Sequence, residues 1–150
     1  MDLAELIARE SVRDLVARYN ANADTGRFDE AVELFAPDAV LEIGAARHEG
    51  RDGIRALFAG TRETVAAHSG GAPRYLRHYT ATLQIDVTSA TTARSRCYYA
   101  VLLDHGLDHW GRYVDEFAEI DARWRFTRRR VTVDGRAEGS MFAASSRPPS

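Results

Sequence analysis

The side chains best suited to acid/base chemistry in this chain are an imidazole and a carboxylate, His78 and Asp24. A histidine has an ordinary pKa of about 6.5, so it can take up a proton at physiological pH. A carboxylate bound to one ring nitrogen would fix the tautomer and stabilise the imidazolium that forms. Two structural alternatives stay open, because Asp24 also fits a helix-ending turn with Thr25 and Gly26, and a strand histidine is often satisfied within a core.

Three further residues could bind or polarise a substrate. Tyr19 lies little more than one helical turn before Asp24, and its phenol could donate to a substrate oxygen or be a core tyrosine. Asp115 shares a strand face with the aromatic Tyr113, where a carboxylate needs either a partner or a function. Arg130 lies on the neighbouring strand and could point inward with Asp115, as a structural ion pair or as an anion clamp.

Four long strands and three helices have to position these residues. Period-two alternation of apolar and polar side chains predicts the strands, and apolar side chains at spacings of three and four predict the helices. The predicted strands are 74–87, 92–103, 110–120 and 123–133, and the predicted helices are 3–23, 28–35 and 53–68, with a short strand at 39–43 and a loop at 44–52. Phe58 lies on the apolar stripe of the third helix, where we expect it to contact a substrate.

His78 poses a problem of parity on the first long strand. It shares its face with polar threonines, whereas Leu83 and Ile85 lie on the apolar face. We therefore expect a bulge or strong bend after His78. On the next strand consecutive tyrosines point to opposite faces, and we expect Tyr99 to line the interior. We expect Tyr99 and Tyr113, on the strand that follows, to bind substrate.

Helices first and long antiparallel strands afterwards indicate an α+β fold, in which three N-terminal helices cover one face of a curved sheet. Such a cone-shaped arrangement leaves a hollow, where small molecules commonly bind. We expect a single domain over residues 1–135. Residues 136–150, rich in glycine, serine, alanine and proline, are expected to form a C-terminal arm or flexible tail.

Composition excludes several classes of function. The net charge of −2 and the lack of a basic-aromatic surface argue against nucleic-acid binding, and no apolar run is long enough for a membrane span. The single cysteine, Cys97, allows no internal disulfide, and with a start that lacks signal-peptide features it favours the cytoplasm. All 20 basic side chains are arginine, which excludes a lysine Schiff base.

The remaining histidines favour neither a metal nor a cofactor. His105 and His109 lie close to Asp104 and Asp108, but at no recognised ligand spacing, and we interpret them as a solvated hairpin loop. The pair Gly70-Gly71 lacks the strand and helix context of a phosphate-binding loop. We therefore expect no metal and no cofactor.

The ordered set of motifs resembles the SnoaL-like branch of the nuclear-transport-factor-2-like (NTF2-like) superfamily, over about residues 5–133. The residues that carry the resemblance are Tyr19 with Asp24-Thr25-Gly26, Leu34-Phe35-Ala36-Pro37-Asp38-Ala39, Gly50-Arg51-Asp52-Gly53-Ile54, Arg77-His78-Tyr79, Gly111-Arg112-Tyr113-Val114-Asp115-Glu116-Phe117 and Trp124-Arg125-Phe126. No single motif is specific, whereas the set in this order is specific for the NTF2-like, or cystatin-like, cone.

Within that superfamily the chain resembles the scytalone dehydratases, the hexachlorocyclohexane dehydrochlorinases and the polyketide cyclases. The resemblance implies that Asp24, at the end of the first helix, orients His78 for proton removal from carbon. It implies a cofactor-independent lyase (dehydratase), cyclase or isomerase that acts on a hydrophobic oxygenated small molecule, such as one resembling a polyketide. The position of the catalytic base of ketosteroid isomerase falls near Ile43, which takes up no proton, and this argues against that form of isomerase chemistry.

Two alternatives belong to other functional classes: a non-catalytic ligand-binding protein, and an accessory chain like the small subunit of ring-hydroxylating dioxygenases. Both use this fold, and a fold does not determine a function. The resemblance also implies a homodimer or homotrimer. The outer sheet face offers apolar side chains for that contact, namely Trp110, Val114, Ile120 and Val131.

Overall fold

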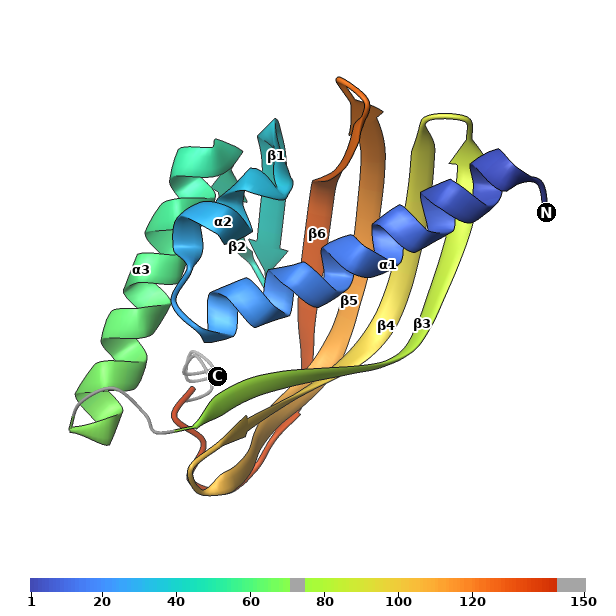
Figure 1. Ribbon diagram of the computed structural model, residues 1–150. Coiled ribbons are helices and arrows are strands. Elements are labelled where there is room, and N and C mark those ends of the chain that lie inside the picture. Colours follow the sequence, from blue (N-terminus) through green and yellow to red (C-terminus); the bar gives the residue numbers. More distant parts are fainter. Residues whose placement is uncertain (71–74, 143–150) are drawn as a thin grey trace.

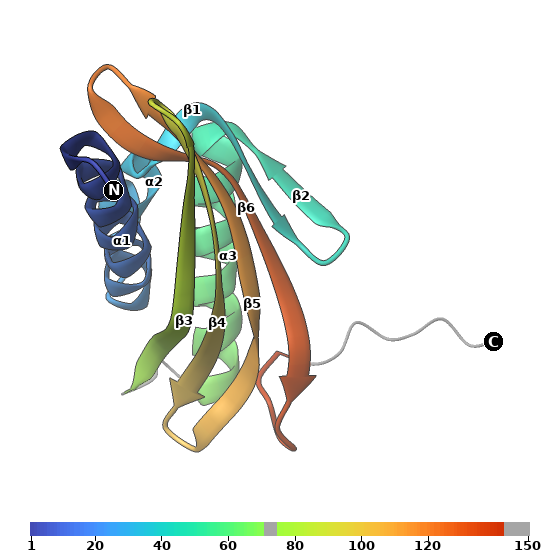
Figure 2. The same ribbon diagram turned by 90° about the vertical axis from the view of Figure 1, so that its right-hand side faces the viewer.

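The computed structural model describes residues 1–70 and 75–142 (Figure 1). Its elements are α1 (Leu3–Asp24), α2 (Phe28–Glu33), β1 (Phe35–Ile43), β2 (Ala46–Glu49), α3 (Gly50–Ser69), β3 (Leu76–Ser89), β4 (Thr92–Leu103), β5 (Gly106–Ile120) and β6 (Arg123–Arg136). The strands form one sheet in the order β2-β1-β6-β5-β4-β3, in which β1 and β6 run parallel and the other neighbours antiparallel. The structure confirms the predicted α+β fold with N-terminal helices packed on a curved sheet (Figure 2).

The helices pack against different parts of the sheet. α1 packs on β3 and β6, and α3 packs on β1 and β2. Their apolar stripes and the inner faces of the strands form one core, which includes Val12, Leu15, Val16, Phe35, Leu41, Ile54, Phe117 and Phe126. Among residues 1–70 and 75–142, no helix combines the length and the apolar character that crossing a membrane requires.

The two ends of α1 are set by local chemistry. Asp2 is the N-cap, and its Oδ1 accepts a hydrogen bond from the backbone amide of Glu5 at 2.8 Å. The helix ends after Asp24, where Gly26 adopts a left-handed φ of 75°. The helix therefore ends where the sequence predicted, and this places Asp24 at its C-terminal end.

The segment between α2 and α3 differs from the prediction. Residues 44–52, predicted as a loop, contain β2 and the first turn of α3, and Phe35 begins β1 instead of ending α2. β2 is a polar strand at the edge of the sheet, and its sequence shows no alternation of apolar and polar residues that would predict a strand. Its strand conformation comes from pairing with β1. Phe35 pairs in parallel with Phe126 on β6. Because of this pairing, Phe35 is the first residue of β1 and not the last residue of α2.

A β-bulge in β3 solves the parity problem of His78. The register of β3 with β4 shifts between Ala81 and Gln84, and Thr82 adopts a positive φ of 58°. Strict alternation would place His78 and Ile85 on opposite faces of the sheet. Because the bulge lies between them, both face the helices: His78 contacts α1, and Ile85 lies in the core. The bulge expected from the sequence is thus confirmed.

The chain continues past β6 along the start of β5. The backbone amide of Ala137 donates to the carbonyl of Asp108 at 2.8 Å, and the amide of Met141 donates to Asp108 Oδ1 at 2.9 Å. Residues 137–142 are therefore tied to β5. The rest of the predicted arm or tail, 143–150, lies outside the described residues.

Replacing Gly111 by alanine is expected to destabilise the protein by about 1–3 kcal/mol, because the position has no room for a side chain. An added Cβ would overlap the carbonyl oxygen of Thr132 and lie 2.9 Å from Tyr99 Oη, which donates a hydrogen bond to that carbonyl at 3.2 Å. Urea unfolding followed by tryptophan fluorescence measures the change. The matched control is Gly60→Ala in α3, where no atom lies within 4 Å of an added Cβ and a gain of about 0.5–1 kcal/mol is expected. Shifts of the same sign in both variants would contradict the prediction.

Candidate active site

The predicted acid/base pair is assembled where the C-terminal end of α1 meets β3 (Figure 1). His78 Nδ1 lies 2.5 Å from Asp24 Oδ1, and the backbone amide of His78 donates to Asp24 Oδ2 at 2.9 Å. The side chain of Asp24 is 4% exposed and the imidazole is 23% exposed. The structure therefore brings together the two residues that the sequence singled out, and it holds both oxygens of the carboxylate.

This contact determines the tautomer of the neutral imidazole. An ionised carboxylate only accepts hydrogen bonds, so Nδ1 of His78 carries the hydrogen and Nε2 carries the lone pair. No residue in the described part of the chain hydrogen-bonds Nε2. The pair can therefore take up a proton at Nε2 while the carboxylate stabilises the imidazolium that results.

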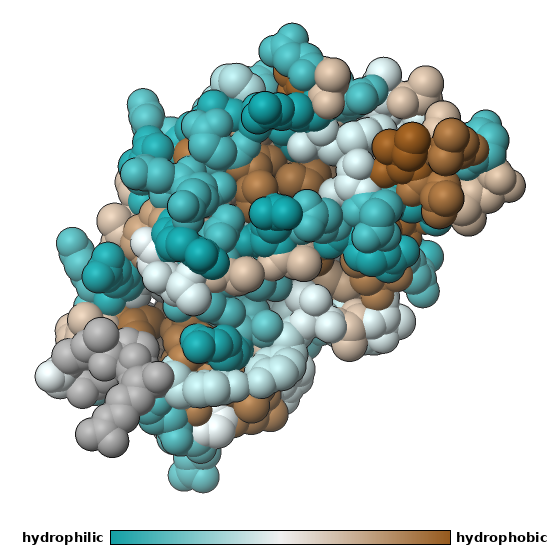
Figure 3. Space-filling model, viewed as in Figure 1, coloured by the Kyte–Doolittle hydropathy of each residue, from teal (hydrophilic) through white to brown (hydrophobic). Residues whose placement is uncertain are grey.

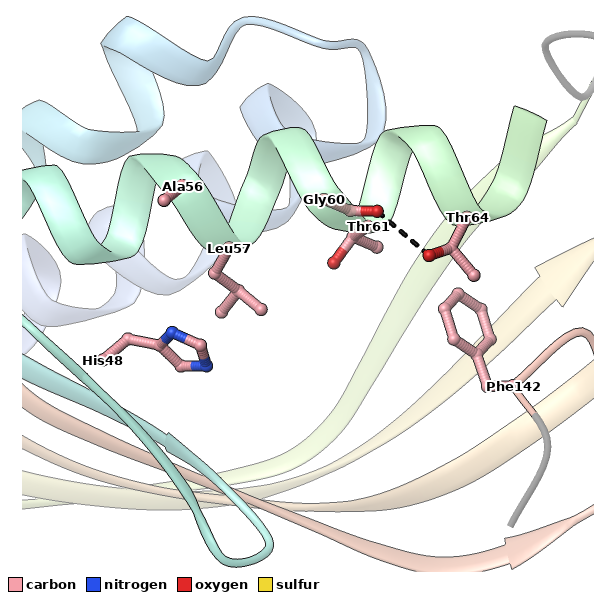
Figure 4. Close-up of a pocket in the computed structure, with 7 residues that line it drawn as sticks. All are labelled: His48, Ala56, Leu57, Gly60, Thr61, Thr64 and Phe142. Carbon is pink, nitrogen blue, oxygen red and sulfur yellow. Dashed lines mark hydrogen bonds between the residues drawn. The ribbon is translucent and has the colours of Figure 1, made fainter. Parts of the chain in front are cut away.

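The dyad borders a pocket. This pocket has a volume of about 360 Å³ and lies between α1 and β3, lined by Ala17, Asn20, Ala21, Asp24, Thr25, Arg27, Arg77, His78 and Thr80. Another pocket has a volume of about 490 Å³ and lies between α3, β2 and Phe142, lined by His48, Ala56, Leu57, Gly60, Thr61, Thr64 and Phe142 (Figure 4). The side chains of Asp24 and His78 are part of the wall of the smaller pocket.

Two tyrosines expected to bind substrate form a stack next to His78. The ring of Tyr99 lies 6.3 Å from the imidazole and stacks on Tyr113 at 4.5 Å with an interplanar angle of 15°. Tyr113 Oη donates to Asn20 Oδ1 at 3.4 Å. Burial raises the pKa of Tyr99 to about 12, so its phenol stays protonated. The stack connects the dyad to the core.

Tyr19 and Phe58 lie in the aromatic core behind this stack. The ring of Tyr19 packs against Phe58 at 6.0 Å and against Tyr113 at 6.3 Å, and both Tyr19 and Phe58 are buried. Burial raises the pKa of Tyr19, although the positive charge of Arg129 opposes the shift. The phenol of Tyr19 is therefore a hydrogen-bond donor across the physiological range.

The expected pairing of Asp115 with Arg130 is wrong. Asp115 instead binds Arg129 through two hydrogen bonds of 2.8 Å, and both side chains are fully buried. Arg130 is half-exposed and pairs with Glu42 at 3.1 Å. The cause is a bulge in β6: Thr127 is an extra residue there, so strict alternation from Phe126 selects the wrong arginine.

Arg129 is a buried cation enclosed by rings. Its guanidinium carbon lies 4.0–4.6 Å from the ring centroids of Tyr19, Tyr113 and Phe126. Burial alone would lower the pKa of Arg129, but Asp115 raises it more, so the group stays charged. Among the described residues, Nη1 of Arg129 has no hydrogen-bond partner. The run of three arginines on β6 was the sequence signal, but alternation alone could not show which of them faces inward.

A second His–Asp contact was missed by the sequence interpretation. Asp108, predicted to lie in a solvated loop, is fully buried at the start of β5. Its carboxylate accepts from His109 Nδ1 at 2.7 Å, from Ser140 Oγ at 2.7 Å and from the amide of Met141 at 2.9 Å, and it pairs with His105 Nε2 at 3.0 Å. Burial alone would raise the pKa of Asp108, but these hydrogen bonds hold it below its ordinary value. Two of the four partners, Ser140 and Met141, lie far along the chain, so no local pattern could reveal that Asp108 is buried.

The stability of the protein is expected to fall between about pH 8.5 and 11 because of Cys97. Burial raises the pKa of its thiol to about 11, whereas the thiol of the unfolded chain ionises near 8.5. The stabilisation that comes from keeping this thiol protonated in the folded chain is complete below about pH 8.5. It is lost as the pH rises, by at most about 1.4 kcal/mol of unfolding free energy per pH unit. Urea unfolding of the wild-type chain and of Cys97→Ala at several pH values measures the difference in slope. Equal slopes in the two proteins would disprove the assignment.

Among the described residues, no group of three or more His, Cys, Asp or Glu side chains is placed to hold a metal ion.

Solved structures share this architecture. A candidate scytalone dehydratase from Novosphingobium aromaticivorans has a TM-score of 0.79 at 20% identity, with 100% of this chain and 99% of that chain covered. A hexachlorocyclohexane dehydrochlorinase, LinA-type3 from Novosphingobium barchaimii, has a TM-score of 0.74 at 18% identity, covering 96% and 99%. An NTF2-like protein with a cystatin-like fold from N. aromaticivorans is 29% identical, with a TM-score of 0.72 and coverage of 91% and 94%. No curated protein sequence matches the chain.

The helices, the curved sheet and these likenesses define an NTF2-like protein of cystatin-like fold. The match to the SnoaL-like domain extends over residues 4–130, and the chain belongs to that family.

Proposed function

We propose that this chain is a cofactor-independent enzyme in which His78, oriented by Asp24, removes a proton from a carbon next to a carbonyl or a leaving group. The observation that carries the proposal is the contact of 2.5 Å between Nδ1 and the buried carboxylate, in an imidazole that still has access to a pocket. A pair of this kind supplies a neutral base and stabilises the charge it gains.

The substrate proposed is a hydrophobic, oxygenated small molecule. The lining of the pocket beside the dyad is mostly polar, which suits the oxygen atoms of a substrate. The side chains behind His78 are the rings of Tyr99 and Tyr113, which suit an apolar body. The names of two similar structures, a candidate scytalone dehydratase and a dehydrochlorinase, both describe elimination. Dehydration or another elimination is therefore the favoured reaction, and cyclisation and isomerisation share its first proton transfer.

Tyr19 is proposed to stabilise the oxygen on which negative charge develops. Its phenol is a donor, and the cation of Arg129 lies against its ring at 4.1 Å. A positive charge in a low-dielectric surrounding favours a developing enolate more than it does in water.

The test is hydrogen exchange on a simple ketone. Incubation of the full chain with 1-tetralone in D₂O is expected to replace the hydrogens on the carbon next to the carbonyl with deuterium, as followed by proton NMR. The control is the His78→Gln variant, in which exchange should fall to the rate in buffer. Identical exchange by the two proteins would overturn the proposal.

One observation favours a non-catalytic reading of the same contact. Asp24 Oδ2 accepts from the backbone amide of His78, so the carboxylate also ties the end of α1 to β3. A ligand-binding protein or an accessory subunit would keep this tie for stability alone. In that case the chain would bind 1-tetralone and catalyse no exchange.

Self-association is proposed through exposed apolar side chains on the outer sheet face. Trp110 and Val114 are exposed there, whereas Ile120 and Val131, which we expected on that face, pack against the core. A second apolar patch lies at the N-terminal end of α1, where Leu3, Leu6 and Ile7 are exposed (Figure 3). Light scattering of the wild-type chain and of Val114→Asp measures whether a dimer or trimer forms through the sheet.

A further inference from the structure

We propose that Asn20 binds the carbonyl oxygen of the substrate, through the Nδ2–H group of its side chain, at the site of Asp24 and His78. The inference rests on the proposed function and deepens it, because it names the substrate class as a carbonyl compound that loses a proton from the carbon next to its C=O group. An alkyl chloride, which carries only a leaving group, offers this amide no oxygen to bind.

Asn20 is a buried polar residue inside a helix. It lies in the last third of α1 and is 6% exposed. Asparagine is a weaker helix former than the alanines at positions 21 and 23. A buried amide also costs free energy where it is not hydrogen-bonded. Neither helix formation nor core packing accounts for an asparagine here, and this favours a role in binding.

Tyr113 determines which way the amide of Asn20 points. The phenol of Tyr113 is buried, and burial raises its pKa well above the ordinary value, so the hydroxyl stays protonated and needs an acceptor. It donates to Asn20 Oδ1 at 3.4 Å. Because the amide oxygen only accepts and the amide nitrogen only donates, Nδ2 lies at the other end of the side chain with its hydrogens unused.

The Nδ2 group of Asn20 opens on the pocket beside the dyad. Within residues 1–70 and 75–142, the only fully buried side-chain nitrogen or oxygen without a hydrogen-bond partner is Arg129 Nη1. Nδ2 of Asn20, which donates to no described residue, is therefore accessible from outside. Asn20 lines the pocket of about 360 Å³. A side chain that is more than nine-tenths buried thus directs an unused donor into this pocket.

Helix α1 places this donor beside the acid/base pair. Asn20 and Asp24 are four residues apart, so they share one face of the helix with their Cβ atoms about 5–6 Å apart. Asp24 Oδ1 lies 2.5 Å from His78 Nδ1, and all three residues line the same pocket. In a ketone, the oxygen and the carbon that loses the proton are bonded to the same carbon atom. One small molecule can therefore place its oxygen about 2.7–3.1 Å from Nδ2 and its reacting carbon about 3–3.5 Å from the imidazole.

The proposed step balances in atoms and charge. Nε2 of His78 takes the proton from carbon, the electron pair of that C–H bond forms a C=C bond, and the electron pair of the C=O π bond moves to the oxygen. The hydrogen bond from Asn20 strengthens as negative charge grows on that oxygen, so it stabilises the transition state more than the ketone. In D₂O, Nε2 exchanges its proton with solvent and returns a deuteron to the carbon.

The charges around the pocket favour the same negative oxygen. Arg27 and Arg77 are part of its wall. Arg77 forms no ion pair with any described residue, and its guanidinium donates to the carbonyl of Leu76 at 2.7 Å. Arg27 pairs with Glu30 at 3.4 Å, but both of these side chains are more than half exposed. Positive charge beside the pocket stabilises an enolate that forms there.

The test measures hydrogen exchange on 1-tetralone in D₂O. Asn20→Ala is expected to lower the rate by about 10²–10³-fold, the usual loss when one donor to a developing oxyanion is removed. The matched control is Asn22→Ala, the same substitution in the same helix at a position that does not line the pocket. Its rate is expected within about twofold of wild type. A loss below about threefold in Asn20→Ala, or equal losses in the two variants, would overturn the inference.

A second variant separates substrate binding from the contact with Tyr113. Tyr113→Phe removes the hydroxyl that donates to Asn20 and keeps the ring that stacks on Tyr99. Nδ2 of Asn20 remains in this variant, so exchange should slow by less than about tenfold. If Asn20 served only the hydrogen bond with Tyr113, Tyr113→Phe and Asn20→Ala would slow exchange alike, and the inference would fail.

Infrared spectroscopy tests the hydrogen bond without any turnover. The probe is 1-tetralone labelled with carbon-13 at the carbonyl. Its C=O stretch should lie at lower frequency in the wild-type complex than in cyclohexane, because a hydrogen bond weakens the C=O bond. Asn20→Ala should remove this shift, or binding altogether, and Asn22→Ala should keep both.

This measurement also separates failure of the inference from failure of the proposed function. If the wild-type chain catalyses no exchange but shows the shift, and Asn20→Ala removes it, the carbonyl site stands and only the proposed chemistry is wrong. A wild-type chain that does not bind 1-tetralone, a complex without the shift, or a shift that persists in Asn20→Ala overturns the inference.

Discussion

His78→Gln is expected to lower the rate of proton removal by about 10²–10⁴-fold, which corresponds to about 3–5.5 kcal/mol of transition-state stabilisation. Glutamine fills a similar space, but its amide takes up no proton at neutral pH. The rate of deuterium exchange into 1-tetralone measures the effect. Unfolding in urea should change little, because the backbone amide of residue 78 still donates to Asp24. A variant that retains full activity would remove His78 from the mechanism.

Asp24→Asn separates orientation from proton transfer at the same site. The amide carries no charge to stabilise an imidazolium and can favour the other tautomer, so the rate is expected to fall by up to about 10⁴-fold. Asp24 also accepts from the backbone amide of His78 at 2.9 Å, and a small loss of stability, about 1 kcal/mol, is expected as well. A loss of stability with no loss of rate would assign Asp24 to structure alone.

Asp115→Ala is expected to lower the free energy of unfolding by about 3–5 kcal/mol, because it leaves the charge of Arg129 buried without its partner. The pair is fully buried and bidentate, and Ser95 Oγ donates to Asp115 at 3.3 Å, so solvent cannot take over. Such a loss is a large part of the total stability of a small domain, about 5–15 kcal/mol. Urea unfolding at neutral pH measures it.

Glu42→Ala on β1 is the matched control, because Glu42 also pairs with arginines of β6. Glu42 pairs with Arg128 at 3.0 Å and with Arg130 at 3.1 Å, but both arginines reach solvent. Its loss is expected to cost about 1 kcal/mol or less. The double variant Asp115→Leu, Arg129→Met should recover most of the stability, since it removes both buried charges. A loss of less than about 1 kcal/mol for Asp115→Ala would show that solvent reaches Arg129 after all.

The sequence by itself was sufficient where the signal is local. α1 ends at Asp24 next to Gly26, as the spacing of its apolar residues and the glycine predict. The hairpins of β3 with β4 and of β5 with β6 follow from period-two alternation and short turns. The order of motifs then gave the family and the candidate pair Asp24 and His78. The bulge in β3 could also be inferred, because the polar and apolar faces changed parity within one strand.

Only the tertiary structure decided which side chains share an interior. A bulge at Thr127 turned Arg129 inward and Arg130 outward, and alternation cannot reveal a bulge in a run of like residues. β2 exists through its pairing with β1, and its own residues show no strand pattern. Asp108 is buried because residues 137–142 cover it and hydrogen-bond its carboxylate. The physical reason is the same in each case. Hydrogen bonds to a distant part of the chain determine which side of the sheet a side chain faces, and the sequence around a residue does not show where those partners are.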